Sequence, residues 1–216
     1  AHGDALDALP WKEAEVFALV TGRIIYLSTD RFDIMFAVRA LASDLASPTK
    51  LSMLRLKRVV KYLLGTSGLC WAYKFQSPGE WACADAYGDS DWAGCNTTRK
   101  SVSAGLLFMG AHPVDIWCSG QQVVALSSGE AEFYSAGTAA AHLLFIIHLM
   151  EELKVKVRGW LWTDSTAARG IMGRTGPGRL RHIQTRFLWV QERVRRKDFE
   201  VKKVLGKINP ADVGTK

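Results

Sequence analysis

Four acidic side chains stand where strand-like or helical stretches of the sequence begin or end. Asp89 closes one strand-like stretch, and Asp164 directly follows another. Glu132 lies early in a long helical stretch, and Asp212 lies near the C-terminus. Carboxylates that converge repel one another unless they hold a hard cation, and oxygen-only ligands suit Mg²⁺. Two such ions in one site can activate a water and stabilise the leaving oxygen of a phosphodiester. These four acids therefore indicate a metal-dependent nuclease.

Two glutamates lie close together at the start of the long helical stretch. The run Ser127-Ser128-Gly129-Glu130 fits a capping box, in which Glu130 reaches back to the N-terminus of its own helix. Residues two apart on a helix point roughly 200° away from each other, so Glu130 and Glu132 cannot both face one site. We therefore assign Glu130 to capping and Glu132 to the metal.

Three aspartates compete for the position on the first strand-like stretch. Asp85, Asp89 and Asp91 are four and two residues apart, and residues separated by an even number share one face of a strand. Periodicity alone therefore leaves all three open.

The elements that would position these acids follow from the spacing of apolar residues. Before residue 80 the pattern is helical, and one helix is expected to begin at Ser47-Pro48-Thr49 and to end at Gly65. Gln76-Ser77-Pro78-Gly79 has the composition of a connector. Beyond it, strands are expected at Trp81–Asp89, Val102–Met109, His112–Trp117, Val157–Thr163 and Phe199–Leu205, and helices at Ser128–Leu153, Ser165–Met172, Phe187–Arg196 and from Asn209 onward. This order predicts an α/β fold, with a mixed sheet covered by helices on both faces.

Positive charge is concentrated in the C-terminal part of the chain. The formal net charge is +7, and residues 169–216 hold thirteen Lys or Arg against four acids. The preceding residues therefore sum to −2. Arg174 and Arg179 lie in a glycine-rich loop, and Arg181 and Arg186 follow it. Flexible backbone beside guanidinium groups suits contact with phosphates, so we expect a polyanionic partner here.

Other classes of protein are disfavoured. The four cysteines form no C-x-x-C pair and have no His partner at zinc spacing, which favours reduced thiols in an intracellular protein. No stretch has the pattern of a secretory signal. The most apolar stretch, Ala136–Met150, includes two histidines and is shorter than a bilayer span, so no membrane partner is expected.

Six motifs occur together in an order and spacing typical of one family. They are GDSDWAG (Gly88–Gly94), TRKSVSAGLLFMG (Thr98–Gly110), VALSSGEAEFYSA (Val124–Ala136), WTDSTAA (Trp162–Ala168), RHI (Arg181–Ile183) and NPADVGTK (Asn209–Lys216). They resemble the ribonuclease H region of copia-type LTR retrotransposon polyproteins. The earlier stretches Ile24–Val38 and Leu56–Gly68 resemble the end of the reverse transcriptase that precedes this region. The resemblance implies a helical segment over residues 1–76, similar to the thumb or connection, and a ribonuclease H-like domain over residues 80–216.

The resemblance also implies a fold, an activity and a site. The family fold is a five-stranded mixed sheet with flanking helices, and the family activity is hydrolysis of the RNA strand of RNA–DNA hybrids with two Mg²⁺ or Mn²⁺ ions. Carried over by position, the catalytic and metal-binding residues fall on Asp89, Glu132, Asp164 and Asp212. The resemblance thus decides the choice that periodicity leaves open on the first strand.

Partners follow from the same resemblance. His182 matches a family position, and with Arg174, Arg179, Arg181 and Arg186 it is expected to contact the nucleic acid. The expected partners are the RNA–DNA hybrid and the rest of the polyprotein, which includes the palm and fingers of the reverse transcriptase and the integrase. The expected location is intracellular, in a cytoplasmic virus-like particle or the nucleus.

The chain departs from the family pattern at three positions. Gly88 stands where serine is usual, Phe32 where proline is usual, and Gln184 where an acid is usual. None of these changes removes a proposed metal ligand. Two alternatives remain open: a catalytically decayed module that binds nucleic acid or tethers the polyprotein, and a DNA-directed nuclease of the same superfamily.

Overall fold

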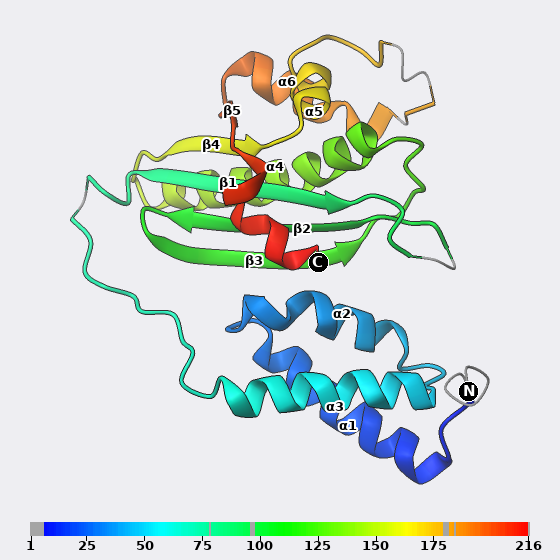
Figure 1. Cartoon of the computed structure of the whole chain (residues 1–216). Helices are drawn as coiled ribbons and strands as arrows, with labels where there is room; N and C mark the ends of the chain where they lie inside the picture. The colour runs from blue at the N-terminus through cyan, green and yellow to red at the C-terminus, as the bar shows by residue number, and fades with distance from the viewer. Residues whose placement is uncertain (1–6, 78, 96–97, 179–181, 184, 216) are drawn as a thin grey trace. The chain divides into compact units, whose positions relative to one another are not determined.

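The chain folds into two compact units, each with its own hydrophobic core. A computed structural model describes residues 7–77, 79–95, 98–178, 182–183 and 185–215 (Figure 1). The first unit spans Ala1–Ala72 and the second spans Tyr73–Lys216. Arg179 and Arg181, two of the residues expected to contact nucleic acid, lie outside the described residues.

The described part of the first unit, from residue 7 onward, contains three α-helices and a short turn. The helices are α1 (Trp11–Leu27), α2 (Met35–Ser43) and α3 (Lys50–Gly65), and the 3₁₀ turn η2 (Phe32–Ile34) precedes α2. The helix α3 begins and ends where the sequence predicts. Thr49 and Ser52 cap it reciprocally, since each side chain accepts a hydrogen bond from the backbone N–H of the other, at 3.2 and 3.1 Å. The core consists of Phe17, Ile24, Ile34, Val38, Leu41, Leu56 and Val59.

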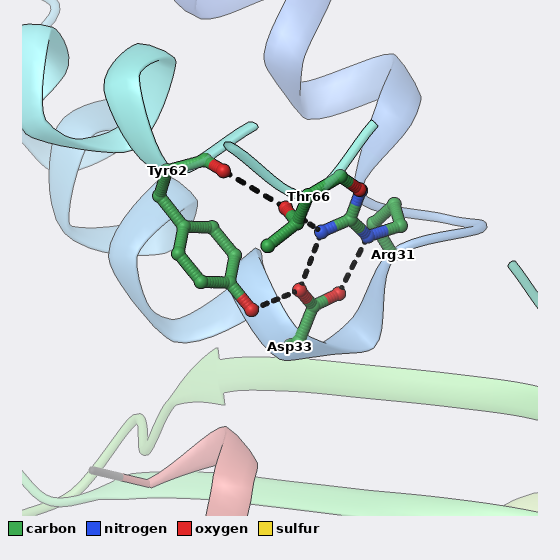
Figure 2. A network of polar contacts seen from close by, with 4 residues as sticks. All are labelled: Arg31, Asp33, Tyr62 and Thr66. Carbon is green, nitrogen blue, oxygen red and sulfur yellow. Dashed lines mark hydrogen bonds and ion pairs between the residues drawn. The ribbon is translucent and has the colours of Figure 1, made fainter. Parts of the chain in front are cut away.

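A polar network fastens the end of α3 to the turn before α2 (Figure 2). The buried Arg31 donates to both carboxylate oxygens of Asp33, at 2.9 and 2.7 Å. It also donates to the carbonyl and the hydroxyl oxygen of Thr66, at 3.1 and 2.8 Å, and the Tyr62 hydroxyl donates to Asp33 at 2.8 Å. The guanidinium of Arg31 holds the pKa of Asp33 below its ordinary value, so the pair is charged in the folded unit.

The second unit is built on one five-stranded mixed sheet with the order β3-β2-β1-β4-β5 (Figure 1). The strands are β1 (Cys83–Asp91), β2 (Val102–Met109), β3 (His112–Gly120), β4 (Arg158–Thr163) and β5 (Glu200–Lys203). The strands β1, β2 and β3 pair antiparallel, whereas β4 runs parallel to β1 and β5 runs parallel to β4. This arrangement confirms the expected α/β class and mixed sheet.

The helices of this unit lie mainly on one face of the sheet. The helix α4 (Ser128–Glu152) packs across β1, β2 and β4. The helix α4 also packs against α5 (Thr166–Met172), and α5 contacts α6 (Trp189–Arg196). A short 3₁₀ turn, η3 (Thr185–Phe187), leads into α6.

In the described part of this unit, the opposite face of the sheet carries 3₁₀ turns: η5 (Pro210–Gly214), which follows η4 (Gly206–Ile208), packs on β1 and β2. The expectation of helices on both faces was therefore wrong for the described α-helices, which lie mainly on one face. Figure 1 shows this C-terminal segment, in red, crossing the sheet on the side away from α4. The prediction of a helix from Asn209 onward was therefore wrong in type. The five residues of η5 form tighter i to i+3 turns, because so short a segment offers few partners for an α-helical ladder.

The helix α4 is the central core element of the second unit. Its 25 residues exceed the apolar stretch seen in the sequence, and by length and hydropathy it could cross a membrane. Half of its apolar window is buried within the protein, however, and Phe133, Ala140, Leu143 and Ile147 belong to the core. The packing against the sheet therefore accounts for its apolar character.

The segment that leaves α3 joins the second unit at Tyr73. The Tyr73 hydroxyl donates to the carbonyl of Pro113, at 3.0 Å. The Gln76 amide donates to the carbonyl of Met109, at 3.2 Å, and accepts from the N–H of Ala111, at 2.7 Å. Gln76, placed in the connector by its composition, is thus bound to the turn between β2 and β3.

Candidate metal centre

Three acidic side chains from three elements meet at one edge of the sheet. Asp89 lies in β1, Asp164 follows the last residue of β4, and Glu132 lies in the first turns of α4. The strands β1 and β4 are parallel, so their carboxyl ends lie at the same edge. One oxygen of each carboxylate lies within 4.8 Å of the other two. The structure therefore brings together three of the four acids that the sequence indicates.

Glu132 is held by the strand beside it. Ser90 donates two hydrogen bonds to Oε1 of Glu132, one from its backbone N–H at 3.2 Å and one from its hydroxyl at 2.8 Å. The second oxygen, Oε2, is buried and has no hydrogen-bond partner among the described residues. Burial, followed by the charges of Asp89 and Asp164, raises the pKa of Glu132 to about 8. A positive ion beside this carboxylate would relieve both effects.

Asp89 is buried and is held from two sides. The Ser135 hydroxyl of α4 donates to the backbone carbonyl of Asp89, at 2.6 Å. From the opposite face, the Thr215 hydroxyl donates to Oδ2 of Asp89. The side-chain amide of Asn209 donates to the carbonyl of Gly88, at 3.3 Å. We call residues 206–215 the C-terminal strap, because they close over β1 beside the acid.

Asp164 lies between the end of β4 and the start of α5. The next residue, Ser165, caps α5 by accepting a hydrogen bond from the N–H of Ala168, at 3.1 Å. Gly206 of the C-terminal strap lies against the carboxylate, and a Cβ at that position would come within 2.8 Å of Oδ2 of Asp164. The absence of a side chain at Gly206 thus leaves room for the acid.

The other acids of β1 have different surroundings. Asp85 accepts a hydrogen bond from the indole N–H of Trp162, at 2.6 Å. The carboxylate of Asp91 packs against Gly94, in the turn that follows the strand. Among the described residues, the metal-competent group contains Asp89 and neither of these two. The geometry thus favours the same aspartate that the resemblance implies.

Asp212 lies beside the cluster and not within it. It belongs to η5 and is partly exposed, and the described group of mutually close acids does not include it. The Thr215 hydroxyl lies within hydrogen-bond distance of two acceptors, Asp89 and the backbone carbonyl of Asp212 at 3.1 Å, between which its single proton is shared. Asp212 is therefore in the segment that holds Asp89, and its role as a fourth ligand stays a prediction.

Glu130 is buried and stabilises the start of α4, as its assignment to capping predicts. Ser127 is the N-cap and accepts from the N–H of Glu130 at 3.2 Å, while Glu130 itself accepts from the N–H of Leu126 at 3.0 Å. Tyr134 donates to its other oxygen at 2.6 Å, and Nε2 of His182 lies 2.8 Å from Oε2. Burial raises the pKa of Glu130, but these hydrogen bonds together lower it below its ordinary value.

Three of the five residues expected to contact nucleic acid can be located. His182 is joined to Glu130 through Nε2, with its side chain 42% exposed. Arg174 donates to the carbonyl of Pro177 at 2.6 Å and so closes its own loop. Arg186 is exposed, with its guanidinium carbon 4.7 Å from the centre of the Phe187 ring.

Two residues that hold the acids were not singled out from the sequence. Ser90 and Thr215 both carry hydroxyls that reach a cluster acid. Both lie inside the motifs quoted above, Ser90 in GDSDWAG and Thr215 in NPADVGTK. A hydroxyl close in sequence to a predicted ligand is the signal that could have identified them.

Trp92, in the motif GDSDWAG, donates to the carbonyl of Ala125 at 3.1 Å and is half exposed.

The donor set of the cluster fits a hard divalent cation. Its three members offer oxygen atoms alone, and one of those oxygens, Oε2 of Glu132, is buried without a hydrogen-bond partner among the described residues. Oxygen ligands of this kind suit Mg²⁺ and Mn²⁺ better than softer metals. The site therefore has the chemistry of a candidate metal centre.

No family model matches the sequence. Comparison with known proteins does identify similar sequences. The retrovirus-related Pol polyprotein from transposon TNT 1-94 of Nicotiana tabacum is 30% identical over 204 residues, which cover 93% of this chain and 15% of that protein. The Pol polyproteins from transposons RE1 and RE2 of Arabidopsis thaliana are 31% and 32% identical over 140 residues, which cover 64% of this chain and 9% of each relative. The chain thus spans between 9 and 15% of the length of these polyproteins. It belongs to the family of retrovirus-related Pol polyproteins of copia-type retrotransposons.

Proposed function

We propose that the second unit is a ribonuclease H-like domain that hydrolyses the RNA strand of RNA–DNA hybrids during retrotransposon reverse transcription. The observation that carries this proposal is the convergence of Asp89, Glu132 and Asp164 at the end of two parallel strands. Membership of the Pol polyprotein family supports a role in a retroelement. The preference for a hybrid substrate rests on the resemblance of the six motifs.

Each acid has a distinct task in this proposal. Asp89 and Glu132, fixed by Thr215 and Ser90, would hold the divalent ions at the sheet edge. Asp164 would complete the set from the start of α5, and Asp212 would approach from the C-terminal strap. When bound, two Mg²⁺ or Mn²⁺ ions supply an activated water and stabilise the leaving oxygen of the phosphodiester.

The basic residues would hold the substrate. In the sequence, Arg174, Arg179, Arg181, His182 and Arg186 all follow α5 within a stretch of fourteen residues. Contacts from such residues to phosphates give affinity without sequence preference. Discrimination of RNA from DNA would come from the 2′-hydroxyls in the wide minor groove of the hybrid.

The first unit would be the end of the reverse transcriptase. Its helices carry the stretches that resemble the thumb or connection, and Arg31 and Asp33 of one stretch form the network that holds the unit together. Its partners would then be the remaining parts of the polyprotein. The proposed location is a cytoplasmic virus-like particle or the nucleus.

The test is a cleavage assay of the whole chain on an end-labelled RNA–DNA hybrid. Cleavage is expected with Mg²⁺ or Mn²⁺ and not with excess chelator. Asp89→Asn, Glu132→Gln and Asp164→Asn should each remove most of the activity. Asp91→Asn is the matched control, because Asp91 lies in the same strand outside the cluster, and it should retain activity.

Three outcomes would contradict the proposal in different ways. Cleavage that persists in chelator would exclude the metal centre. Binding of the hybrid without cleavage would identify a decayed module that only grips nucleic acid. Cleavage of duplex DNA in preference to the hybrid would identify a DNA-directed nuclease.

A further inference from the structure

Glu130 is buried more deeply than capping alone would explain. Its side chain is 1% exposed, and glutamates are almost never fully buried unless they are paired. The cap uses one hydrogen bond, which Oε2 of Glu130 accepts from the N–H of Leu126, at 3.0 Å. The other two donors to this carboxylate, Tyr134 and His182, lie outside the cap. They indicate a second role for Glu130.

Both of these donors lead to one segment of the chain, residues 182–183 and 185–187, which we call the η3 segment. His182 belongs to this segment, and its Nε2 lies 2.8 Å from Oε2 of Glu130. Because a carboxylate only accepts, Nε2 is the donor. Tyr134 contacts the segment through its ring, whose centre lies 4.4 Å from that of Phe187. The two contacts therefore join the η3 segment to a single buried carboxylate.

The η3 segment also presents a cation to solvent. Arg186 is exposed, and its guanidinium carbon lies 4.7 Å from the centre of the Phe187 ring. A guanidinium on an aromatic face can still bind a phosphate through the N–H groups at its edge. Through Phe187 and Tyr134, the position of Arg186 is linked to the same carboxylate.

A ligand of the metal centre lies on the same turn of α4. Glu132 is two residues beyond Glu130, and positions two apart on a helix point about 200° away from each other. One turn of helix therefore holds a metal ligand on one side and the η3 segment on the other. A helix with its side chains is about 10 Å across, so a rigid element sets the distance between the two.

We infer that Glu130 is a positioning residue for the substrate, and that its carboxylate holds the η3 segment where a nucleic acid bound at the metal centre places a phosphate. His182 is the tether in this arrangement, and Arg186 is the phosphate contact. A segment that is already ordered loses less conformational entropy when the substrate binds, which raises the affinity. The inference deepens the proposed function and rests on it.

The test changes His182 in the whole chain, because Glu130→Gln would keep an acceptor oxygen for it. His182→Ala removes the donor, and His182→Gln restores an N–H donor without an imidazole. The affinity for an end-labelled RNA–DNA hybrid, measured in chelator, should fall about tenfold in His182→Ala, the effect of ordering one or two side chains. His182→Gln should bind like wild-type. Cleavage at saturating substrate with Mg²⁺ should change little in either variant, because the metal ligands are intact.

Two further variants serve as control and cross-check. Thr185→Ala changes an exposed side chain of the same segment and should match wild-type. Arg186→Gln should weaken hybrid binding about tenfold, the effect of losing one charge-assisted hydrogen bond. In the His182→Ala background it should weaken binding by much less, because Arg186 is then no longer held in place. This loss of additivity measures the coupling of the two side chains.

Hydrogen exchange gives a readout that does not depend on nuclease activity. The N–H of Leu188 donates to the carbonyl of Thr185, at 2.9 Å, so its exchange reports on the order of the η3 segment. Without substrate or metal, exchange at Leu188 should be faster in His182→Ala than in the wild-type and His182→Gln proteins. Exchange in β1 should stay the same, which shows that the sheet is retained.

Three results would overturn the inference. Unchanged exchange at Leu188 in His182→Ala would mean that Ile183 and Phe187 hold the segment without the tether. A loss of cleavage at saturating substrate that is equal in His182→Gln and His182→Ala would mean that the imidazole itself acts on the substrate. Additive effects of Arg186→Gln and His182→Ala would mean that the two side chains act independently.

Failure of the proposed function would look different. If the wild-type chain neither binds nor cleaves the hybrid, while exchange at Leu188 still rises in His182→Ala, the proposed function is refuted. The substrate role inferred for Glu130 is refuted with it, and Glu130 is then a structural anchor of the η3 segment.

Discussion

Ser90 and Glu132 lie 42 residues apart in the sequence, yet both donors of Ser90 converge on a single carboxylate oxygen of Glu132. This double contact ties the central strand to α4. It also fixes which oxygen of Glu132 is left for an ion, because Oε2 has no hydrogen-bond partner among the described residues.

Ser90→Ala should therefore weaken the metal site without removing a ligand. Groups that orient metal ligands typically contribute 10- to 100-fold in metal affinity or activity. The backbone N–H of Ser90 remains in the variant, so we expect the lower end, about tenfold weaker Mn²⁺ binding by calorimetry. The control is Ser43→Ala, which removes an exposed hydroxyl in the first unit. Unchanged Mn²⁺ affinity in Ser90→Ala would show that the backbone contact alone positions Glu132.

The two glutamates at the start of α4 should respond differently to the same substitution. Glu132→Gln should remove most hybrid cleavage while the fold survives. Glu130→Gln should remain folded and active, because a glutamine can still accept from the N–H of Leu126 and share a hydrogen bond with Tyr134. Cleavage rates and thermal melts of both variants check this. The reverse result, in which Glu130→Gln is folded but inactive and Glu132→Gln is active, would show that Glu130 and not Glu132 binds the metal.

The metal-free protein should lose stability as the pH rises. The ordinary pKa of Glu132 is 4.5, and in the fold it is raised to about 8. Between these values the folded state binds more protons than the unfolded state, so the free energy of unfolding falls with increasing pH. Each pKa unit corresponds to about 1.4 kcal/mol, so the total effect is on the order of a few kcal/mol.

Denaturant titrations at several pH values, with wild-type and Glu132→Gln proteins compared in chelator, measure this effect. The difference between the two proteins isolates the contribution of this one group. Saturating Mg²⁺ should reduce the dependence on pH, because the ion stabilises the charged carboxylate. Parallel pH profiles for the two proteins would show that Glu132 ionises normally.

The Arg31 network should dominate the stability of the first unit. Arg31→Met leaves Asp33 without its guanidinium partner and leaves Thr66 with unpaired acceptors. Breaking a largely buried ion pair of this kind costs on the order of 2 kcal/mol or more. Hydrogen exchange over α1, α2 and α3 should rise, while exchange in α4 should not change. The control is Arg23→Met, at an exposed arginine of α1, which should leave both patterns as they are.

The salt dependence of hybrid binding should report on the basic loop. Changing Arg174, Arg179 and Arg181 together to Ala should weaken binding most at low salt, and each lost phosphate contact should lower the salt slope by about 0.9. Cleavage at saturating substrate should change little, since these residues are not proposed ligands. The control triple variant changes Lys57, Arg58 and Lys61 of α3 to Ala. If that variant lowers the slope and the loop variant does not, the substrate path lies on the first unit.

The strands and α4 could be predicted because their signals are local. The strand expected at Val102–Met109 matches β2 residue for residue, and the Ser127 cap fixes the first residue of α4. Helix geometry alone separates Glu130 from Glu132, and the structure places them as that argument requires. Such features depend on neighbours within one turn or one strand.

The contacts that hold the acids could not be predicted in this way. Asp85, Asp89 and Asp91 share one strand periodicity, and only the position of β1 beside β4 distinguishes them. The segment after Asn209 has no apolar period, so its 3₁₀ turns and its path over the sheet depend on tertiary packing. The hydrogen bond from Thr215 to Asp89 joins residues that are 126 positions apart, so no pattern of neighbouring residues in the sequence predicts it.

The C-terminal strap is translated last, so the contact that holds Asp89 can form only after the three acids of the cluster have been synthesised. Thr215 is 126 residues beyond Asp89, so a chain leaving the ribosome contains Asp89, Glu132 and Asp164 long before the residue that holds Asp89 exists. A stop codon or frameshift within η5 would spare all three of these acids and still leave Asp89 without its hydroxyl partner. Among genomic copies of such an element, an intact reading frame through Thr215 is therefore a stricter sign of a working site than the presence of these three acids.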